Sequence, residues 1–597
     1  MKGRILNFLK EHPGVPYRKR ELARHLKVAR SGYRTFRSEL KKLQNQGEVF
    51  RVREGGYVWV DPGDRIEGKL VVHQKGFGFL LVDDGDDIFV SSRNLMGAIH
   101  GDTVEVALLP PPFRRRSEGH VTRIIKRGTD EFVGTVVAQD GTSYLEIDPV
   151  TPRRGIRIIE PSPMEFSSWD VVVAKVEDWG TRRRPIQVKV LKVIGSMDRP
   201  EDDMKIVCHR FDLDPHFSHK VVTESKRFSR EDIEREKGHR ADLTQETCIT
   251  IDPADARDFD DALSIDRDRH GNVVIGVHIA DVSFFVAPGS ELDREARRRG
   301  TSVYFAEGVV SMLPEALSAG LCSLVPEEDR LALSVKITLD NSGDVAGASF
   351  HDSVIRNARR FTYREVQSVL DGKMESKYSS MLKEMNRISQ VLLGKRQERG
   401  SIDFDIPEPI FRFRDGSIPH EIHPSERLDS HRIVEEFMLL ANRVVAERVP
   451  KSGERHLPFV YRIHDQPPAG DMEKFLDVLT RFQLYHSKTS HISPAEFRKI
   501  LASVEDSPYR GLIENLALRT MTKAVYSVEN RGHYGLAFDM YTHFTSPIRR
   551  YPDLLVHRMV KEYALIRRQS TVPFSAKILA SVAASSTSAS PVPGGRR

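Results

Sequence analysis

Thr250 to Leu263 reads TIDPADARDFDDAL, a stretch that follows directly on an apolar, strand-like segment at residues 248–251. It places five carboxylates close together: Asp252, Asp255, Asp258, Asp260 and Asp261. Carboxylates at this density repel one another unless protons or cations neutralise them, and ligand sets made only of oxygen suit hard ions such as Mg²⁺ or Mn²⁺. The stretch therefore predicts a metal site, with a solvated acidic turn as the alternative.

The spacing of these aspartates constrains the backbone. In an extended segment Asp258 and Asp260 would point to one side and Asp261 to the other, so the chain must curl if all three are to face one ion. An EF-hand calcium loop is excluded, because a count from Asp258 puts Ala262 and Arg269 at the fifth and twelfth ligand positions.

Size and composition are those of a folded protein with several domains. The chain has 597 residues, of which 39% are hydrophobic and 29% charged. No apolar run approaches the roughly 18 residues of a membrane helix, so we expect a cytoplasmic protein without a membrane partner. Cys208, Cys248 and Cys322 form no CxxC pair, which argues against a disulfide framework or a structural zinc site and predicts small buried residues.

Positive charge is concentrated at the N-terminus. The net charge of the whole chain is +6, but residues 1–60 hold 15 Lys or Arg against 5 Asp or Glu, a balance of +10 that leaves −4 for the remainder. A basic N-terminal segment followed by an acidic central stretch predicts a polyanionic partner that is delivered to a metal-dependent site.

Residues 1–62 are predicted to form a winged helix-turn-helix. Apolar positions recur at helical spacing in three segments, residues 4–12, 18–27 and 31–46. The following EVFRVREGGYVWV reads as a hairpin that turns at Gly55 and Gly56. The third helix would carry the cations Arg34, Arg37, Lys41 and Lys42. A small helical protein-interaction domain is the alternative.

Residues 63–125 are predicted to form a small all-β barrel of the OB type that resembles a cold-shock domain. The strings KGFGF and IFV place Phe77, Phe79 and Phe89 where they can form a face for stacked bases. Each stacked base is worth about 1–3 kcal/mol. Core packing is the alternative for aromatic residues in strands.

The rest of the chain is predicted to divide into further segments. Residues 126–196 repeat the strand-rich pattern of a second OB barrel, and residues 197–240 form a charged connecting segment. Residues 241–579 mix helical and strand patterns around the acidic stretch, which predicts a large α+β domain. Residues 580–597 are rich in Ser, Ala, Pro and Gly, which predicts a disordered tail.

Several motifs occur in order after the acidic stretch: VHIADVS (277–283), GTSVYFAEGVVSMLPEALSAGLCSL (300–324), HRIVEEFMLLAN (431–442), YRIHDQP (461–467) and HYGLAFDMYTHFTSPIRRYPDLLVHR (533–558). Together with the acidic stretch they resemble the RNB catalytic domain of the ribonuclease II and ribonuclease R family. The winged-helix-like segment and the two barrels upstream are more similar to the layout of ribonuclease R than to that of ribonuclease II.

This resemblance implies an activity. We expect a Mg²⁺-dependent 3′-to-5′ exoribonuclease, with Mn²⁺ as a second candidate ion, that hydrolyses single-stranded RNA from its 3′ end to nucleoside 5′-monophosphates in RNA decay and quality control. We also expect the protein to be a monomer. Phosphodiester hydrolysis needs an activated water and neutralisation of the charge that builds on the phosphorane oxygens, and divalent ions held by carboxylates supply both.

The resemblance also assigns roles to the aspartates. Asp252 and Asp261 match direct metal ligands of the family, and Asp258 matches a supporting ligand. Asp260 matches the carboxylate that is most closely tied to the chemistry.

Arg549, in TSPIRRYPD, matches the family's arginine near the scissile phosphate, where a planar guanidinium can bind two phosphate oxygens. The alternative is that Arg549 or Arg550 forms only a salt bridge with Asp553.

Three further residues are implied to contact the RNA. Tyr304 matches a tyrosine that stacks against the terminal nucleotide and sets the length of the end product, whereas a lone aromatic in VYF is otherwise typical of a core. His278 and Glu435 match positions that border the RNA channel of the family.

The chain departs from the family pattern after Leu579, where a C-terminal OB-fold RNA-binding domain would follow. We therefore expect RNA to be held less firmly, and an RNA-binding regulator with catalysis impaired by this truncation is the alternative function. A DNA-binding transcription factor built on the winged helix is a further alternative, which leaves most of the chain without a role.

Overall fold

The computed structural model describes residues 1–565 except 46–47, 52–55, 60–64, 74, 83–86, 109–117, 148–154, 182–183, 404–408, 414–418, 452–456 and 486–491. The predicted tail at 580–597 therefore lies outside the described residues. The chain forms two compact units, Met1–Asp212 and Leu213–Arg597.

The first unit begins with three helices and a small sheet. The helices are α1 (Lys2–Glu11), α2 (Lys19–His25) and α3 (Tyr33–Asn45), with a 3₁₀ turn η1 (Arg30–Gly32) before α3. The strands β1 (Tyr17–Arg18), β2 (Val49–Arg51) and β3 (Gly56–Trp59) form an antiparallel sheet in the order β1-β3-β2. The apolar residues that predicted the helices form one buried cluster, which includes Ile5, Leu9, Leu22, Phe36, Leu40 and Leu43. The predicted turn at Gly55 lies outside the described residues.

Two closed β-barrels follow in the same unit. The first consists of β4 (Arg65–Val72), β5 (Gly78–Leu81), β6 (Ile88–Val90), β7 (Thr103–Leu108) and β8 (Glu118–Lys126), in the order β4-β5-β6-β8-β7. The second consists of β9 (Glu131–Gln139), β10 (Thr142–Ile147), β11 (Ile156–Ile158), β12 (Asp170–Asp178) and β13 (Ile186–Ser196), in the order β10-β11-β13-β12-β9. In both barrels the third strand is parallel to the fifth and the other pairs are antiparallel. The second barrel therefore repeats the topology of the first, as the repeated strand pattern predicts.

The predicted connecting segment 197–240 is divided between the two units. Its first part, η2 (Pro200–Asp202) and α4 (Asp203–Arg210), follows β13 in the first unit. Its second part, α5 (His219–Ser225) and α6 (Arg230–Lys237), belongs to the second unit.

The second unit is built on a mixed sheet. Its strands are β14 (Ala241–Asp242), β15 (Cys248–Asp252), β16 (Asp261–Arg267), β17 (Val273–Ala280), β20 (Asp329–Leu339) and β21 (Val345–Thr362), in the order β14-β21-β15-β16-β17-β20, with β20 also paired to β21. Strand β21 runs parallel to β14 and β15, whereas β15, β16, β17 and β20 are successively antiparallel.

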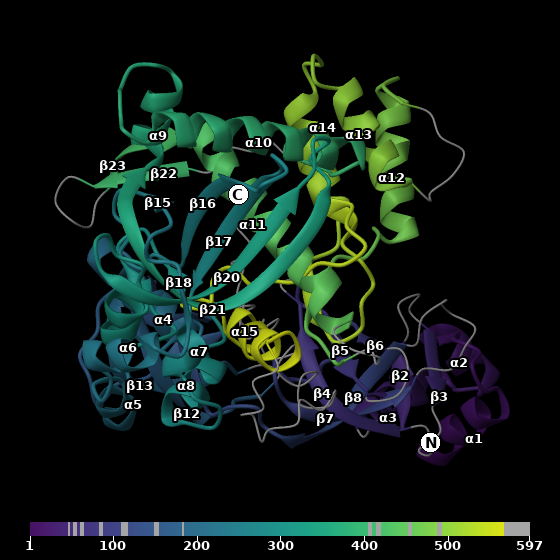
Figure 1. Ribbon diagram of the computed structural model, residues 1–597. Coiled ribbons are helices and arrows are strands. Elements are labelled where there is room, and N and C mark those ends of the chain that lie inside the picture. The colour runs from purple at the N-terminus through teal and green to yellow at the C-terminus, as the bar shows by residue number, and fades with distance from the viewer. Residues whose placement is uncertain are drawn as a thin grey trace. The chain divides into compact units, whose positions relative to one another are not determined.

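Long helices cover one face of this sheet. Figure 1 shows α10 (Ser379–Glu398) and α11 (Asp429–Arg448) lying across it, with α9 (Tyr363–Leu370) close by. The main core is formed where Met385, Leu392 and Phe437 of these helices pack with Ile275 and Val335 of the sheet.

A second core lies against the segments around the acidic stretch. It joins residues of α7 (Val282–Phe285), α8 (Glu291–Arg299), the π-helical turn η3 (Ala316–Leu321) and α15 (Tyr551–Tyr563). The short strands β18 (Val303–Tyr304) and β19 (Val309–Val310) form a separate two-stranded sheet. The end of the described chain is thereby packed against segments more than 200 residues earlier, for example through Tyr551 and Asp293.

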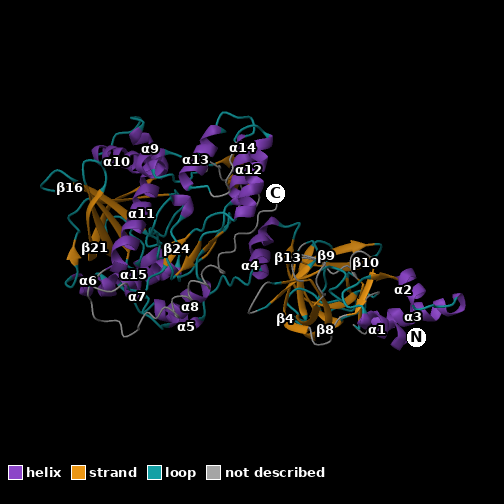
Figure 2. Ribbon diagram, turned by 90° about the vertical axis from the view of Figure 1, so that its right-hand side faces the viewer, coloured by secondary structure: helices purple, strands orange, loops and turns teal. Residues whose placement is uncertain are grey.

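A third cluster holds together α12 (Ala469–Arg481), α13 (Pro494–Ser503) and α14 (Arg510–Thr520), which stand side by side in Figures 1 and 2. The remaining elements are short: the hairpin β22 (Pro409–Phe413) with β23 (Pro419–Pro424), the pair β24 (Tyr461–Ile463) with β25 (Val525–Ser527), and the turns η4 (Val449–Lys451) and η5 (Tyr534–Leu536).

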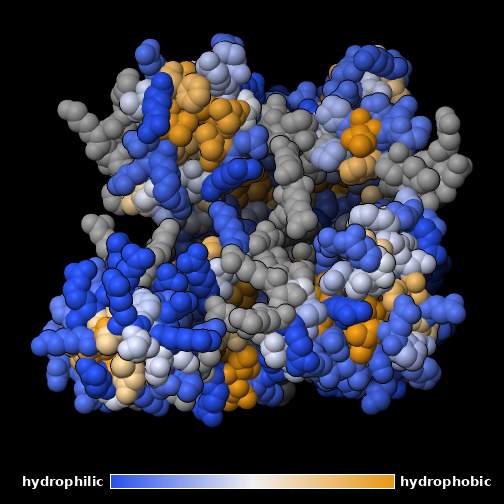
Figure 3. Space-filling view, turned by 180° about the vertical axis from the view of Figure 1, so that it is seen from behind, coloured by the Kyte–Doolittle hydropathy of each residue, from blue (hydrophilic) through white to orange (hydrophobic). Residues whose placement is uncertain are grey.

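The face drawn in Figure 3 is mostly hydrophilic, with small separate apolar areas. Within the described part of the chain, every helix is too short or too polar to cross a membrane. Cys208, Cys248 and Cys322 are free and buried, as predicted.

Candidate active site

The acidic stretch curls between two strands of the sheet, as its spacing predicts. Asp252 ends β15 and Asp261 begins β16, and these antiparallel neighbours are paired through Ile249 and Leu263. Because an antiparallel pair turns back at one edge, Asp252 and Asp261 meet at the same edge of the sheet. The residues between them form the turn that carries Asp258 and Asp260.

Asp260 is the most enclosed carboxylate of the stretch, with 5% of its surface exposed. Its Oδ1 accepts a hydrogen bond of 2.9 Å from the backbone N–H of Ile548, and its Oδ2 lies 3.7 Å from Nε of Arg549. Burial raises the pKa of Asp260 well above its usual range, and the charge of Arg549 and the Ile548 N–H act against this rise. The loop before α15 therefore supplies the polar partners of a carboxylate nearly 300 residues away.

Asp252 and Asp261 are held in a setting that disfavours negative charge. Burial, together with the charge of Asp261, raises the pKa of Asp252 to about 8. Burial raises the pKa of Asp261 to about 6, although Arg549 and Arg550 oppose the rise. Oδ2 of Asp252 is buried and accepts no hydrogen bond from the described residues. The neighbouring cations thus do not offset the cost of burying these carboxyl groups.

The donor chemistry of this turn fits a hard divalent cation. The side chains of Asp252, Asp258, Asp260 and Asp261 offer only carboxylate oxygens, and one of those oxygens is buried without a partner. Within the described residues no group of three or more His, Cys, Asp or Glu side chains is arranged as a complete metal site. The turn therefore has the ligand types for a cation, but not a closed set of ligands around one point.

Arg549 and Arg550 have different partners. Arg550 forms ion pairs of 2.8 and 3.0 Å with Asp553, whose side chain is fully buried at the start of α15. Arg549 instead donates from Nη2 to Oγ of Ser546 at 3.2 Å and lies beside Asp260. Its side chain remains 43% exposed. The simple salt bridge to Asp553 thus applies to Arg550, whereas Arg549 faces the acidic turn.

Tyr304 lies on the surface beside the same turn. It is 54% exposed, and its hydroxyl donates a hydrogen bond of 3.0 Å to Oδ2 of Asp258. Partial burial of the hydroxyl and the negative charge of Asp258 both raise the pKa of Tyr304. Packing in a core, the alternative for this tyrosine, is therefore wrong.

His278 does not lie at this surface. Its ring is fully buried in β17, with Nε2 2.9 Å from Oγ of Ser264 and Nδ1 2.7 Å from Oγ of Ser334. Burial lowers the pKa of His278 to about 3, so the ring is neutral. The prediction that His278 contacts RNA is wrong, because both ring nitrogens are hydrogen-bonded to serines inside the sheet.

Glu435 lies on α11 and is partly exposed. It forms an ion pair of 2.9 Å with Arg427, which also binds Asp403 at 2.7 Å. Arg396 lies 3.6 Å from its carboxylate. Glu435 is thus held by two cations, and its contact with RNA stays a prediction.

Two residues near the turn were missed by sequence reasoning. Arg360 donates to the backbone oxygens of Pro253 and Ala254, and its charge acts against the raised pKa of Asp252. Tyr363 begins α9, and its pKa is raised by burial and then by the charges of Asp261 and Asp252. Both are brought to the site because β21 runs parallel to β15, with Thr362 opposite Asp252. Only this strand pairing reveals them.

The first unit carries the predicted aromatic face. Phe77, Phe79 and Phe89 lie with ring centroids 5.4 to 5.7 Å apart, and the ring of His73 stacks on Phe77 at 4.7 Å. All three phenylalanines are partly exposed, whereas their strand neighbours Gly78, Leu80, Ile88 and Val90 are buried. The alternation therefore turns the phenylalanines out of the barrel, and core packing is wrong for all three.

Comparison with known families gives three matches along the chain. Residues 240–565 match the RNB domain, residues 68–124 the Ribonuclease B OB domain and residues 148–218 a cold shock domain. The cold-shock match thus covers β11 to β13 of the second barrel and the segment after them, while the first barrel matches the OB domain of the ribonucleases.

Whole-chain comparisons agree with these matches. The chain is 35% identical to ribonuclease R of Aquifex aeolicus over 91% of this chain and 77% of that protein, and 35% identical to ribonuclease R of Escherichia coli over 89% of this chain and 66% of that protein. The apo form of Mycoplasma genitalium RNase R superposes with a TM-score of 0.77 at 27% identity, covering 88% of this chain and 84% of the other. The chain therefore belongs to the RNB-domain family of ribonuclease R.

Proposed function

We propose that this chain is a metal-dependent 3′-to-5′ exoribonuclease that releases nucleoside 5′-monophosphates from single-stranded RNA. The observation that carries the proposal is that one turn holds four carboxylates beside the partly exposed guanidinium of Arg549 and the exposed ring of Tyr304. A phosphodiester placed there would contact the guanidinium of Arg549 and the carboxylates of the turn.

Asp252, Asp258, Asp260 and Asp261 would hold Mg²⁺, or Mn²⁺ in its place. When bound, a divalent ion there supplies a more acidic water and neutralises charge on the phosphate. The raised pKa values of Asp252 and Asp261 and the unpartnered oxygen of Asp252 support this assignment, because a cation would remove the cost of bringing these carboxylates together.

The remaining roles fall to side chains that face outward. Arg549 would bind two oxygens of the scissile phosphate and stabilise the negative charge that grows during hydrolysis. Tyr304 would stack on the last base, since its ring is exposed while its hydroxyl is fixed by Asp258. Asp260, whose carboxylate is fixed by Ile548 and Arg549, would be the group most sensitive to substitution.

The upstream unit would bind the single strand. Phe77, Phe79 and Phe89 form a face on which bases can stack, and Glu435 would line the strand's path in the catalytic unit. We infer that residues 1–62 form a winged helix whose third helix presents Arg34, Arg37, Lys41 and Lys42 to the phosphates.

Two solved structures of Mycoplasma genitalium RNase R, in complex with ribose-methylated single-stranded RNA and with double-stranded RNA, support RNA as the partner. We further propose that the enzyme acts as a cytoplasmic monomer.

An RNA-binding regulator without turnover is the second candidate. Yeast Ssd1, described as a pseudonuclease, shares this fold with a TM-score of 0.64 at 20% identity, so the fold alone is compatible with a protein that does not cleave. The presence of Asp252, Asp258, Asp260, Asp261 and Arg549 favours the nuclease.

Digestion of end-labelled RNA separates these functions. A 3′-labelled single strand should release its label as mononucleotide from the start, and a 5′-labelled strand should shorten to a small final fragment. Both reactions should stop with EDTA and resume with excess Mg²⁺, and a DNA strand of the same sequence should stay intact. Binding without release of mononucleotide would instead support the regulator.

A further inference from the structure

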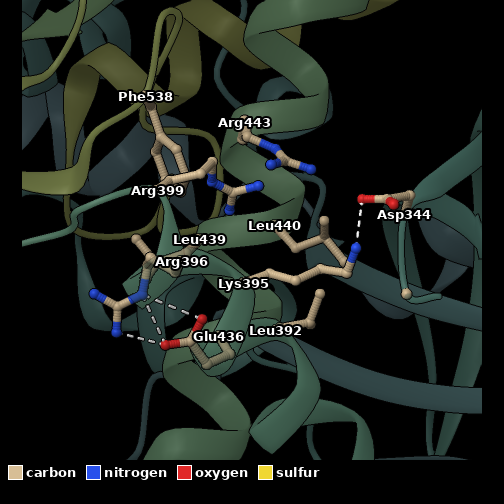
Figure 4. Close-up of a pocket in the computed structure, with 11 residues that line it drawn as sticks. Asp344, Leu392, Lys395, Arg396, Arg399, Glu436, Leu439, Leu440, Arg443 and Phe538 are labelled. Carbon is tan, nitrogen blue, oxygen red and sulfur yellow. Dashed lines mark hydrogen bonds and ion pairs between the residues drawn. The ribbon is translucent and has the colours of Figure 1, made fainter. Parts of the chain in front are cut away.

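A small hollow lies in the second unit where α10 and α11 meet the turn between β20 and β21. Figure 4 shows the side chains that surround it: Lys395 and Arg396 lie on α10, Arg399 directly follows it, Arg443 lies on α11, and Phe538 comes from a later loop. The hollow spans about 340 Å³ of space, most of it open solvent at its mouth, and its enclosed part is no larger than about one or two water molecules. None of the residues that line it belongs to the acidic turn or to the RNA-contacting set proposed above.

Close packing shapes one wall of the hollow. Gly343 sits in the turn between β20 and β21 with φ +79°, and a Cβ atom there would stand only 2.7 Å from Val391 of α10. This glycine lets the turn approach the helix, so that Asp344 reaches Lys395 with an ion pair of 2.8 Å. Lys395 is thereby neutralised.

Arg396 is neutralised as well. It forms an ion pair of 2.6 Å with Glu436 and also donates to Oγ of Ser401 at 2.8 Å. Arg396 and Glu436 are almost fully buried. This pair closes the inner end of the hollow and leaves no charge for a ligand.

Arg399 and Arg443 are left without comparable partners. Within the described residues no carboxylate forms an ion pair with Arg399, and that of Glu447 comes no nearer to Nε of Arg443 than 3.7 Å. Nε of Arg443 is buried and makes no hydrogen bond to the described residues. Burial and the neighbouring charge of Arg443 lower the pKa of Arg399.

Both guanidinium groups gather around one ring. Their central carbons lie 5.4 and 5.6 Å from the centroid of Phe538, which holds the two cations near each other although they repel. The lining residues count four cations and two carboxylates, a balance of 4 − 2 = +2. An arrangement of this kind has the charge to hold one small dianion at the open mouth of the hollow.

We propose that this hollow binds a phosphate group, either free phosphate or the terminal phosphate of a nucleotide, between Arg399 and Arg443. Guanidinium groups present planar pairs of N–H donors that match two oxygens of a phosphate, and the dianion would neutralise the surplus charge. Phe538 is too enclosed to stack on a base, so recognition would be limited to the phosphate. The site would be separate from the proposed catalytic turn.

Phosphate binding can be measured directly by calorimetric titration of the metal-free full chain in EDTA, at constant ionic strength set with chloride. The ligands are inorganic phosphate, adenosine 5′-monophosphate and adenosine. The double variant Arg399→Gln/Arg443→Gln removes both cations that lie beside Phe538. Arg387→Gln is the matched control, since Arg387 is an exposed cation of the same helix that pairs with Glu384 away from the hollow.

We expect phosphate or the monophosphate to bind the wild-type chain and the Arg387→Gln control equally, adenosine not to bind, and the double variant to bind at least about tenfold more weakly. Tighter binding of inorganic phosphate would assign the site to free phosphate, and equal or tighter binding of the monophosphate would assign it to the terminal phosphate of a nucleotide. If the double variant fails to fold, Arg399→Gln alone, which changes a surface side chain, should still weaken binding. No binding to the wild-type chain, or binding that is unchanged in these variants, would overturn the proposal.

Discussion

Nε of Arg549 lies 3.7 Å from Oδ2 of Asp260, while the adjacent Arg550 pairs with Asp553. Two consecutive arginines thus divide into one that faces the acidic turn and one that fixes the start of α15. We therefore expect Arg549 to act in catalysis and Arg550 in stability.

Substitution of the two arginines should therefore affect two different properties, stability for Arg550 and turnover for Arg549. Arg550→Ala leaves the buried Asp553 without its ion pair and should lower the free energy of unfolding by about 3 kcal/mol, because an unpaired buried charge is costly. Arg549→Ala should leave stability nearly unchanged and lower turnover by about 100-fold or more, because it removes charge stabilisation at the phosphate. Urea unfolding and single-turnover hydrolysis measure the two effects. Equal loss of stability in both variants would place Arg549 in the structural role too.

Tyr304→Ala should change the length of the final RNA fragment more than the rate at which it forms. If the ring clamps the last base, its loss lets the 3′ end stop short of the turn. Tyr304→Phe is the control, since it keeps the ring and removes only the hydrogen bond to Asp258. A sequencing gel that shows the same end product for wild type and Tyr304→Ala would show that the ring does not hold the RNA.

Phe77→Ala should weaken binding of single-stranded RNA by about 5- to 150-fold, the equivalent of the 1–3 kcal/mol of one stacked base. Leu81→Ala offers a matched control, because Leu81 is an exposed apolar residue in the neighbouring part of β5 but has no ring. Fluorescence anisotropy with a labelled oligonucleotide measures both. Equal weakening in the two variants would indicate a general apolar contact instead of stacking.

The basic third helix should contribute to the salt dependence of binding. Four cations, Arg34, Arg37, Lys41 and Lys42, can be replaced together by Gln without touching the core of this segment. Each cation that binds a phosphate adds about 0.7 to the slope of log affinity against log salt, so the fourfold replacement should reduce that slope by up to about 3. The slope is measured by titrating a labelled single strand at several salt concentrations. An unchanged slope would indicate that this helix binds a partner other than RNA.

Local patterns predicted much of the architecture. Helical spacing located α1 to α3, alternation located both barrels, and the density of carboxylates located the turn between β15 and β16. These features depend on residues close together in the chain, which is why a single sequence reveals them. The roles of individual side chains came from the family resemblance and not from spacing.

Other features depend on distant pairings that no local pattern encodes. Arg360 and Tyr363 reach the turn through the parallel pairing of β21 with β15. His278 was misassigned because β17 is a central strand that is buried on both faces, so its histidine faces serines of neighbouring strands. The exposure of Tyr304 could not be predicted from the local sequence either, since β18 is a two-residue strand at the surface.

Asp260→Asn tests the central claim most directly, because Asp260 joins the acidic turn to the loop of Ile548 and Arg549. The substitution preserves size and removes the charge, and Asp255→Asn, at an exposed position of the same turn, is its matched control. In single-turnover release of mononucleotide from a 3′-labelled RNA with Mg²⁺, Asp260→Asn should fall by about 100-fold or more while RNA affinity stays within a factor of about two. Asp255→Asn should keep wild-type turnover. An Asp260→Asn variant that retains more than about a tenth of wild-type turnover would contradict the account, since an electrostatic group at the reacting phosphate cannot be removed at so small a cost.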